Sequence, residues 1–313
     1  MPSLLITGGC GFIGSHIVEE CIRRGYERIR ILDNLSTGFQ TNIKPFLSLP
    51  NVELMVGSIQ HIDACREAVK GMTMICHQAA LVSVPESLEK PSECHDINVT
   101  GFLNVLIAAK KEGIKRVVYA TSSAVYGDDT RSSKQEDSLG KALSPYAVTK
   151  RMNELHADMV TSSYGMEVIG LRYFNVYGPR QNPKGPYAAV ISKFTELLRN
   201  EQPVTIFGDG SFSRDFVFVR DIVQANLLAL ETTNPHCFGS IYNIGTGQSC
   251  TILELYTRLQ QILKQTPISP IIQPNRPGDI AHSRADIQKA CQELCYQPKY
   301  DLQTGLSEFI ESL

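Results

Sequence analysis

Short apolar segments alternate with stretches of helical periodicity through the first 173 residues of the chain. Most of these segments are rich in β-branched side chains, which is typical of buried strands. They lie at residues 4–7, 29–32, 52–56, 74–76, 117–120 and 168–173. Helical spacing of apolar residues fills the intervals, in one stretch that ends near Gly25 and in others at 62–70, 91–112 and 145–164. Repeated strand–helix units predict a doubly wound parallel sheet with helices on both faces.

The strict alternation ends after residue 173. Short strands are expected at 204–207, 216–219 and 241–244, and helices at 188–199, 221–231, 252–264, 285–295 and 302–313. We therefore predict an α/β protein with its main domain over residues 1–173. A segment near 215–245 is expected to return to its sheet, and residues 174–313 to form mainly a smaller mixed α/β substrate lobe.

Three glycines at intervals of three residues follow the first strand: Gly8, Gly11 and Gly14. A tight turn and close approach to a pyrophosphate need no side chain there, and the helix N-terminus beyond offers free N–H groups. The second strand ends in Asp33, where an acid binds ribose hydroxyls and repels a 2′-phosphate. These features predict a Rossmann-type site for NAD rather than NADP. Ala79 and Ala80, after the fourth strand, either let the cofactor lie against the backbone or serve packing alone.

Tyr146 and Lys150 lie four residues apart in a helix that Pro145 opens, so both are on the same face. A lysine ammonium near a phenol favours the phenolate, so we expect the pKa of Tyr146 to lie below its ordinary value of about 10. Ser122 and Ser123, where the fifth strand ends, can donate hydrogen bonds to the same substrate oxygen. Such pairs also occur by chance on surface helices. The dinucleotide site in the same sheet favours a catalytic base that takes a proton from an alcohol.

Composition narrows the class of protein. The 313 residues are 42% hydrophobic and 20% charged, and a net charge of −2 gives no reason to expect a nucleic acid partner. No signal peptide is recognised, and no apolar run approaches the roughly 20 residues that span a bilayer. Nine scattered cysteines favour reduced thiols and a cytoplasmic location. The seven histidines lack metal-ligand spacing, so no metal site is expected.

Together the motifs resemble the extended short-chain dehydrogenase/reductase family over nearly the whole chain, and within it the UDP-hexose 4-epimerases. Two stretches, residues 143–150 and 185–193, look like the branch of UDP-N-acetylglucosamine 4-epimerases. The motifs that carry the resemblance are residues 7–14, 33–35, 77–80, 122–127, 144–146 with Lys150, 171–180 and 276–279.

This resemblance implies NAD that is held tightly and recycled within each turnover. Tyr146 would remove the proton of the sugar 4-hydroxyl while the C4 hydride moves to the nicotinamide. Lys150 would hold the nicotinamide ribose, and Ser122, with Ser123, would hydrogen-bond O4. The 4-keto sugar would then rotate and receive the hydride on its opposite face. The implied cofactor-binding residues are Gly8, Gly11, Phe12, Ile13, Gly14, Asp33, Asn34, Gly38, Ser58, Ile59, Gln78, Ala79, Ala80, Tyr146, Lys150 and Tyr173.

The same resemblance implies a UDP-sugar as substrate. Asn175, Arg214 and Arg276 would hold the diphosphate, and Phe207 would pack near the uracil. Ser83 and Gln181 would line the sugar pocket. The full set of implied substrate-binding residues is Ser83, Ser122, Asn175, Gln181, Ala189, Val190, Phe207, Arg214, Arg276, Asp279 and Ser283.

Three positions bear on the substrate and the reaction. Ser283 falls where relatives carry a gate beside the sugar C2 substituent, and a small residue there leaves room for an N-acetyl group. Related 4,6-dehydratases and UDP-glucuronate decarboxylases carry an acid where this chain has Ser123-Ala124, which disfavours elimination of water. Ser58 replaces an acid common in the family and brings no charge to the adenine, which puts the affinity for free NAD in doubt.

Several interpretations remain open at this point. The first is an epimerase of UDP-GlcNAc and UDP-GalNAc, with UDP-Glc, UDP-Gal and the uronate forms as further substrates. The others are a dehydratase or net oxidoreductase of the same fold and an NAD-binding scaffold without catalysis. A scaffold has no use for an activated phenol, so the epimerase is favoured. By resemblance we also expect a homodimer formed through the helices at 91–112 and 145–164.

Overall fold

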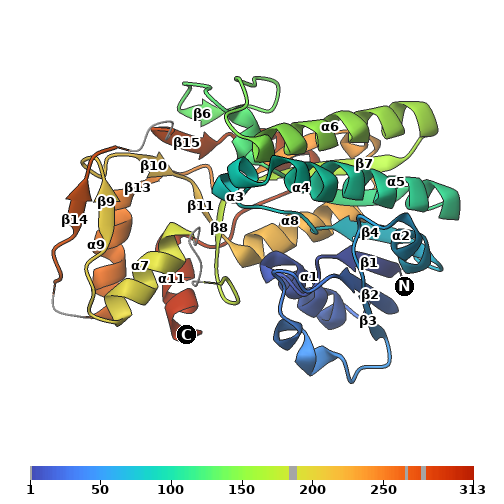
Figure 1. Cartoon of the computed structure of the whole chain (residues 1–313), viewed down its shortest axis with the longest axis horizontal. Coiled ribbons are helices and arrows are strands. Elements are labelled where there is room, and N and C mark those ends of the chain that lie inside the picture. Colours follow the sequence, from blue (N-terminus) through green and yellow to red (C-terminus); the bar gives the residue numbers. More distant parts are fainter. Residues whose placement is uncertain (1, 183–188, 265–266, 276–279) are drawn as a thin grey trace.

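Seven parallel strands form the central sheet of the computed structural model, which describes residues 2–182, 189–264, 267–275 and 280–313 (Figure 1). Their order across the sheet is β12-β7-β5-β4-β1-β2-β3. The α/β fold class predicted from the sequence is thereby confirmed. The strands are β1 (Ser3–Thr7), β2 (Arg28–Asp33), β3 (Val52–Val56), β4 (Met74–His77), β5 (Arg116–Ser122), β7 (Glu167–Tyr173) and β12 (Ile241–Ile244).

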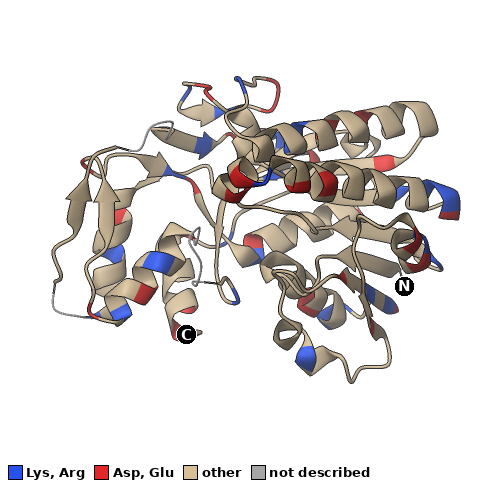
Figure 2. Ribbon diagram, in the orientation of Figure 1, with Lys and Arg blue, Asp and Glu red and all other residues tan. Residues whose placement is uncertain are grey.

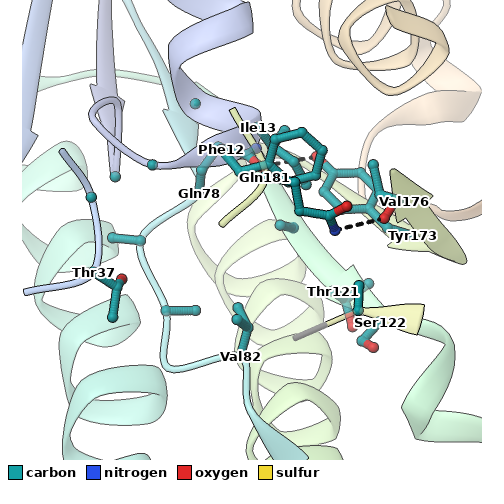
Figure 3. Close-up of a pocket in the computed structure, with 18 of the residues that line it drawn as sticks. Phe12, Ile13, Thr37, Gln78, Val82, Thr121, Ser122, Tyr173, Val176 and Gln181 are labelled. Atoms are coloured by element: carbon teal, nitrogen blue, oxygen red, sulfur yellow. Dashed lines mark hydrogen bonds between the residues drawn. The ribbon is translucent and has the colours of Figure 1, made fainter. Parts of the chain in front are cut away.

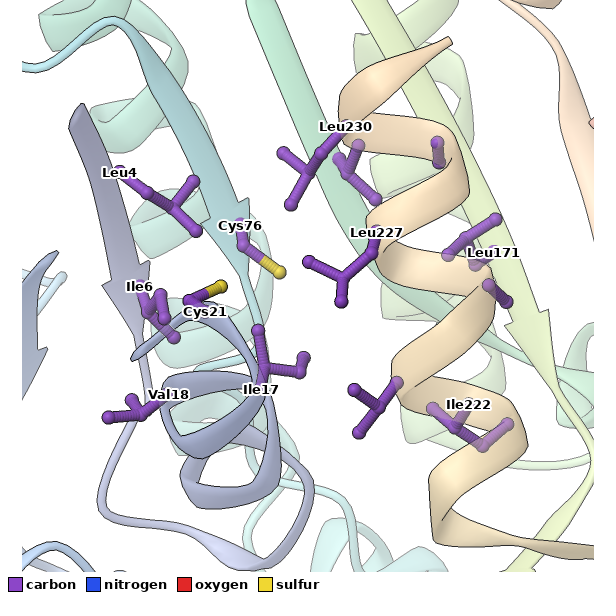
Figure 4. Close-up of a cluster of buried hydrophobic side chains, with 14 of the residues drawn as sticks. Leu4, Ile6, Ile17, Val18, Cys21, Cys76, Leu171, Ile222, Leu227 and Leu230 are labelled. Atoms are coloured by element: carbon purple, nitrogen blue, oxygen red, sulfur yellow. The ribbon is translucent and has the colours of Figure 1, made fainter. Parts of the chain in front are cut away.

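Helices cover both faces of this sheet. On one face Leu4, Ile17 and Leu227 belong to a single buried cluster (Figure 4). On the other face Phe102 and Val160 belong to a second cluster. Burying such a side chain contributes roughly 1.5–3 kcal/mol relative to leaving it exposed, so these two layers hold the sheet rigid. The first face carries α1 (Phe12–Arg23) and α8 (Val219–Glu231), and the second carries α2 (Ile62–Val69), α5 (Gly101–Glu112) and α6 (Pro145–Tyr164).

The strand order reverses between β1 and β4. The chain passes from β1 outward to β2 and β3 and then crosses back to β4, which pairs with the other side of β1. At such a switch point the carboxyl ends of neighbouring strands leave a crevice where ligands bind. Thr7 and His77 are register partners at these ends, and the Thr7 hydroxyl lies 2.8 Å from Nδ1 of His77.

The helix expected at residues 91–112 is interrupted by a π-helical turn at Asp96–Thr100. Such turns are often found at functional sites. This one contains Asn98, which is buried and makes two hydrogen bonds to the backbone of Leu81. The Asn98 amide donates to the Leu81 carbonyl at 2.9 Å and accepts from the Leu81 N–H at 2.8 Å, which fixes the loop after β4. The expected helix is thus divided into α4 (Pro91–His95) and α5, and a separate short helix, α3 (Val84–Glu89), precedes it.

A second lobe, formed mostly by residues after β7, has its own core. A third cluster of buried side chains, among them Phe194, Leu255 and Phe309, joins three of its helices. Its strands pair as β8 with β11, as β9 with β14, and as a four-stranded sheet in the order β13-β10-β15-β6. The elements are β6 (Ser133–Lys134), β8 (Asn175–Tyr177), α7 (Val190–Arg199), β9 (Thr205–Phe207), β10 (Ser213–Arg214), β11 (Phe216–Phe218), β13 (Cys250–Thr251), α9 (Ile252–Leu263), β14 (Ile271–Gln273), β15 (His282–Ala285), α10 (Gln288–Glu293) and α11 (Leu302–Glu311).

Several expected boundaries in this lobe differ from the structure, and in two places the type of element changes. The helix expected at 285–295 begins only at Gln288, because Arg284 and Ala285 belong to β15 and pair with β6. Pairing between segments far apart in the sequence overrides the local helical pattern there. The strand expected at 216–219 ends at Phe218, and Val219 already starts α8.

Acidic and basic residues are interspersed along the helices of both lobes (Figure 2). Within the ranges that the structure describes, no helix has the length and apolar character needed to cross a membrane.

Asp215 ties three segments of the chain together at the junction of the two lobes. Its carboxylate is fully buried and accepts hydrogen bonds from Thr246 N at 2.8 Å and Oγ1 at 2.7 Å. The second oxygen accepts from Gly247 N at 3.0 Å and Ala285 N at 3.1 Å. Burial raises the pKa of this carboxyl, and the four donors oppose the shift. The loop after β12 and the end of β15 are therefore held to the β10–β11 junction by one side chain.

Replacing Asp215 with Asn turns one of the two acceptor oxygens into an NH₂ group that faces N–H donors. We expect Asp215→Asn to lower the free energy of unfolding by roughly 2–4 kcal/mol. The exposed Asp209 provides a matched control, and Asp209→Asn should stay within about 0.5 kcal/mol of the parent. Urea denaturation followed by circular dichroism measures both. Equal midpoints for the two variants would contradict the role given to Asp215.

Candidate active site

A cavity of about 450 Å³ opens at the carboxyl ends of β1, β4 and β5 (Figure 3). It extends from the glycine loop after β1 to the first residues of the second lobe. Most of the residues assigned from the sequence to the cofactor line it, together with the three principal catalytic candidates. Its lining comprises Gly8, Gly11, Phe12, Ile13, Gly14, Asp33, Thr37, Gly38, Gln78, Ala79, Ala80, Val82, Ala120, Thr121, Ser122, Tyr146, Lys150, Tyr173, Phe174, Val176, Gln181, Asn182 and Ala189.

The glycine loop is shaped to hold a phosphate group. Gly8 has φ of +71°, and a Cβ there would lie 2.7 Å from the backbone N of Ala79. A Cβ on Gly14 would lie 2.2 Å from the Gly8 carbonyl oxygen. No side chain caps the N-terminus of α1 at Gly11, and no acid occupies its first turn. The uncapped helix N-terminus therefore suits the negative charge of a pyrophosphate.

Asp33 lies at the end of β2, next to this loop. Its carboxylate accepts from Cys10 N at 2.9 Å and from Leu35 N at 2.8 Å, which fixes its orientation. Each oxygen keeps a further lone pair for a ribose hydroxyl. The side chain is 7% exposed and lines the cavity, as expected for a group that reads the ribose.

A second cavity of about 440 Å³ continues past Asp33 towards the end of β3. It shares Thr37, Ala79, Ala80 and Val82 with the first cavity. Three residues assigned to the cofactor from the sequence line it, and so does one residue assigned to the sugar. These are Asn34, Ser58 and Ile59 for the cofactor, and Ser83 for the sugar. Ser83 also caps α3, and its hydroxyl accepts from Glu86 N at 3.1 Å.

Tyr146 and Lys150 project from the first turns of α6 into the main cavity. Ser144 caps this helix by accepting from Ala147 N at 3.1 Å, and Pro145 occupies its first turn. The backbone N–H of Tyr146 donates to Ser87 Oγ at 3.1 Å. These contacts place the phenol opposite Ser122, at the end of β5, where the two side chains interact.

Burial dominates the titration of both groups. It raises the pKa of Tyr146 to about 12, which the interaction with Ser122 only partly opposes, and it lowers the pKa of Lys150 to about 8. Nζ of Lys150 lies 5.9 Å from the Tyr146 ring centre and donates to the Ala120 carbonyl at 2.9 Å. The expected lowering of the phenol pKa by Lys150 is therefore wrong, because desolvation of the phenol outweighs the effect of an ammonium at this distance.

A buried ion pair fixes α6 against the sheet. Glu154, one turn beyond Lys150, accepts from Arg172 of β7 through both carboxylate oxygens, at 2.8 and 2.9 Å. The same carboxylate accepts from the Thr121 hydroxyl of β5 at 3.0 Å. Arg172 also donates to the Tyr126 hydroxyl at 3.0 Å. The helix that carries Tyr146 and the strand that carries Ser122 are thus bound to one carboxylate.

Gln181 enters the cavity from a strap formed by residues 178–182. Figure 3 shows its side chain near Val176, whose carbonyl accepts from Nε2 at 3.0 Å. Its oxygen accepts from Ser192 at 2.8 Å. The preceding Arg180 has φ of +66°, which is uncommon for a residue other than glycine.

Side chains of helix α1 also bind this strap. The His16 ring donates from Nε2 to the Pro179 carbonyl at 2.9 Å, and burial lowers the pKa of His16 to about 4. Arg180 forms an ion pair with Glu19 at 2.5 Å and reaches Ser15 Oγ at 3.4 Å. The helix that begins at the glycine loop therefore also holds the segment that carries Gln181.

Several residues assigned from the sequence do not line either cavity. Ser123 begins a 3₁₀ turn at Ser123–Tyr126, directly after Ser122. Arg214 and Ser283 are register partners in β10 and β15, so the two assigned groups are adjacent. Arg276 and Asp279 lie outside the described residues. The assigned residues absent from both cavity linings are Ser123, Asn175, Val190, Phe207, Arg214 and Ser283.

Some lining residues had no signal in the sequence, and others adjoin a motif that was recognised. Phe174 and Val176 lie within the recognised motif at residues 171–180, and Asn182 adjoins the assigned Gln181. Val82 and Thr37 belong to no motif. Asn226 of α8 lies outside the lining but accepts from the Tyr173 hydroxyl at 3.0 Å and from Gln78 Nε2 at 3.0 Å. The sequence does not reveal this role of Asn226, because its contacts with Tyr173 and Gln78 depend on how α8 packs against the sheet.

Among the described residues, no group of three or more histidine, cysteine, aspartate or glutamate side chains is arranged to hold a metal ion.

Comparison with known proteins gives a consistent result. Residues 4–245 match the model of the NAD dependent epimerase/dehydratase family. The chain is 38% identical over 309 residues to a putative UDP-glucose 4-epimerase of Methanocaldococcus jannaschii, covering 98% of this chain and 97% of that protein.

Solved structures are equally similar. The UDP-N-acetylglucosamine 4-epimerase of Methanobrevibacter ruminantium, in complex with UDP-N-acetylmuramic acid, superposes with a TM-score of 0.93 at 36% identity, covering 99% of this chain and 97% of that one. The dTDP-glucose 4,6-dehydratase DesIV of Streptomyces venezuelae, with NAD bound, gives 0.91 at 30% identity, with coverage of 99% and 96%. With this glycine loop, ribose carboxylate and Ser122–Tyr146–Lys150 group, the chain belongs to the NAD dependent epimerase/dehydratase family, and NAD is its cofactor.

Proposed function

We propose that the protein is a 4-epimerase that interconverts UDP-GlcNAc and UDP-GalNAc, with UDP-Glc and UDP-Gal as further candidate substrates. The observation that carries the proposal is the meeting of Ser122, Tyr146 and Lys150 with the glycine loop around one cavity. Asp33 is the sole acidic residue among the described lining residues, and it lies at the ribose end. Elimination of water needs a further acid–base group beside the sugar, which this lining does not offer.

In the proposed reaction Tyr146 accepts the proton of the sugar 4-hydroxyl and later returns it. NAD would supply the redox chemistry at C4 of the sugar, where hydride is removed and then returned. Lys150 would bind the ribose hydroxyls of the cofactor, with its Nζ 5.9 Å from the centre of the Tyr146 ring. Ser122 donates a hydrogen bond to O4 and orients it towards Tyr146.

The proposed preference for N-acetylated sugars is supported by Ser283. This side chain is small, 8% exposed, and lies directly beside Arg214 in the register of β10 and β15. Arg214 suits a diphosphate because its guanidinium presents paired N–H donors. A diphosphate held there would have a residue without bulk beside it, at the position where the resemblance places the sugar C2 substituent.

Incubation of the purified protein with UDP-GlcNAc, without added NAD, tests the proposal. We expect conversion to UDP-GalNAc at constant mass, detected by chromatography and mass spectrometry. Tyr146→Phe removes only the hydroxyl, so it should keep the fold and the bound cofactor and lower turnover at least ~100-fold.

Other outcomes would each favour an alternative. Loss of 18 mass units would indicate a dehydratase, and accumulation of NADH a net oxidoreductase. Turnover of UDP-Glc or of the uronate alone would remove the argument from Ser283. No reaction with any of these sugars, even with NAD added, would favour a binding scaffold.

At pH values below the lowered pKa of Lys150, its buried ammonium should reduce the free energy of unfolding. The folded-state pKa of about 8 lies below the usual 10.5, so the penalty is complete below pH 8 and disappears as the pH rises towards 10.5. We expect Lys150→Met to stabilise the cofactor-free protein by roughly 2 kcal/mol at pH 7, since the lost bond to Ala120 offsets part of the gain, and to abolish turnover. Thermal unfolding at pH 7 and 10 measures the effect, with exposed Lys111→Met as control. A stabilisation that persists unchanged at pH 10 would contradict this account.

A homodimer is also part of the proposal. Val148, Met152, Leu155 and Met159 form an exposed apolar stripe along α6, and Ile107 of α5 is 46% exposed. The spacing of four, three and four residues places the α6 side chains on one face of the helix. Such a face is typical of a helix that packs against a partner.

A charge in the middle of this stripe should separate the proposed subunits. We expect Leu155→Glu to convert a dimer into a monomer in size-exclusion chromatography with light scattering. Leu253→Glu, on the exposed surface of α9, is the matched control and should leave the mass unchanged. A monomeric parent protein, or a dimeric Leu155→Glu variant, would contradict the proposal.

A further inference from the structure

The second cavity ends at a turn that follows β3 and contains Ser58 and Gln60. Asp33, at the adjacent end of β2, marks the place of the adenosine ribose. The adenine attached to that ribose must lie beyond it, and the second cavity is the space that continues there. Ser58 stands where many relatives have an acid, so its surroundings decide how this chain recognises the base.

Ser58 and Gln60 form a closed pair of hydrogen bonds. The Ser58 hydroxyl donates to Oε1 of Gln60 at 3.1 Å and accepts from the Gln60 backbone N–H at 3.2 Å. A serine hydroxyl has a single proton, and this contact uses it. Ser58 therefore offers no donor to a ligand. It sets the orientation of the Gln60 amide, with the oxygen on the Ser58 side.

Helix α5 holds the backbone of this turn through hydrogen bonds and packing. The Asn104 side chain donates to the carbonyls of Ile59 and Gln60, at 3.0 Å each. The Ile59 side chain is 5% exposed and packs directly over Gly101, where a Cβ would lie 2.6 Å from its terminal carbon. The turn is therefore rigid before any ligand arrives, so little ordering of Gln60 is required on binding.

The charged groups of this cavity are already paired. Glu86 and Glu93 both lie near Lys90, with Nζ–carboxylate distances of 3.5 and 3.6 Å. Ser58 and Gln60 are neutral, and they line the cavity beside Asn34 where β2 and β3 end. A base bound between these strand ends would meet an oriented amide rather than a carboxylate.

We propose that Gln60, oriented by Ser58, recognises the adenine of NAD. The second lone pair of Oε1 accepts from the 6-amino group, and Nε2 donates to a neighbouring ring nitrogen. A glutamine amide and adenine present complementary donor and acceptor pairs. In hypoxanthine a carbonyl replaces the amino group, so the amide must turn over to match it. Turning the Gln60 amide breaks its hydrogen bond from Ser58. Ser58 therefore causes the preference for adenine over hypoxanthine.

This inference rests on NAD as the cofactor and is independent of the sugar and of the reaction. The test therefore measures binding alone. Protein stripped of nucleotide is reloaded from an equal mixture of NAD and nicotinamide hypoxanthine dinucleotide. The bound nucleotides are then released and quantified by chromatography. Failure of the proposed epimerase activity would leave this readout unchanged.

The parent protein should take up NAD over the hypoxanthine analogue by about tenfold, the size expected for one unmatched polar pair. Gln60→Ala should bring the ratio close to one by weakening NAD alone. Ser58→Ala should also bring it close to one, because the freed amide can turn, while most of the NAD affinity remains. Gln303→Ala, on the exposed surface of α11, is the control and should keep the parent ratio.

A parent ratio near one, or Gln60→Ala with the parent ratio, would overturn the proposal. Thermal unfolding of each variant establishes that it is folded. A variant that fails to fold is replaced by Gln60→Met, which keeps the length of the side chain without its amide. Retention of the parent ratio in Gln60→Met would overturn the proposal equally.

Discussion

The buried ion pair between Arg172 and Glu154 is the constraint on which the arrangement of the proposed catalytic groups depends. An unpaired charge at this depth would be costly, so neither side chain can move without the other. Because Glu154 also binds Thr121, the pair fixes the helix of Tyr146 relative to the end of β5. The distance between the Tyr146 phenol and the Ser122 hydroxyl is therefore fixed by this buried ion pair.

The sequence predicts the parts of this site that follow from local rules. A glycine loop between a strand and a helix has few other structural explanations once Asp33 follows at the end of the next strand. Tyr146 and Lys150 share a helix face because the helical period brings residues four apart together. Parallel strand order then places all of them at one edge of the sheet, so their meeting in one cavity was predictable.

Other features depend on contacts that no local pattern reveals. The four-stranded sheet of the second lobe consists of two- to four-residue strands, and Arg284 and Ala285 join it only because β6 is beside them. The raised pKa of Tyr146 depends on how much of the chain surrounds the phenol, which spacing does not encode. The hydrogen bonds between Ser58 and Gln60 likewise require a turn whose shape is set by α5.

The contacts between α1 and the strap (residues 178–182) restrict how segments can be exchanged between related proteins. The strap carries Gln181 into the main cavity, yet Ser15, His16 and Glu19 hold it from the helix that starts at the glycine loop. A chimera that takes the strap from a relative of different sugar preference would separate it from its anchor. A chimera designed to transfer sugar specificity therefore needs the second turn of α1 from the same relative as the strap.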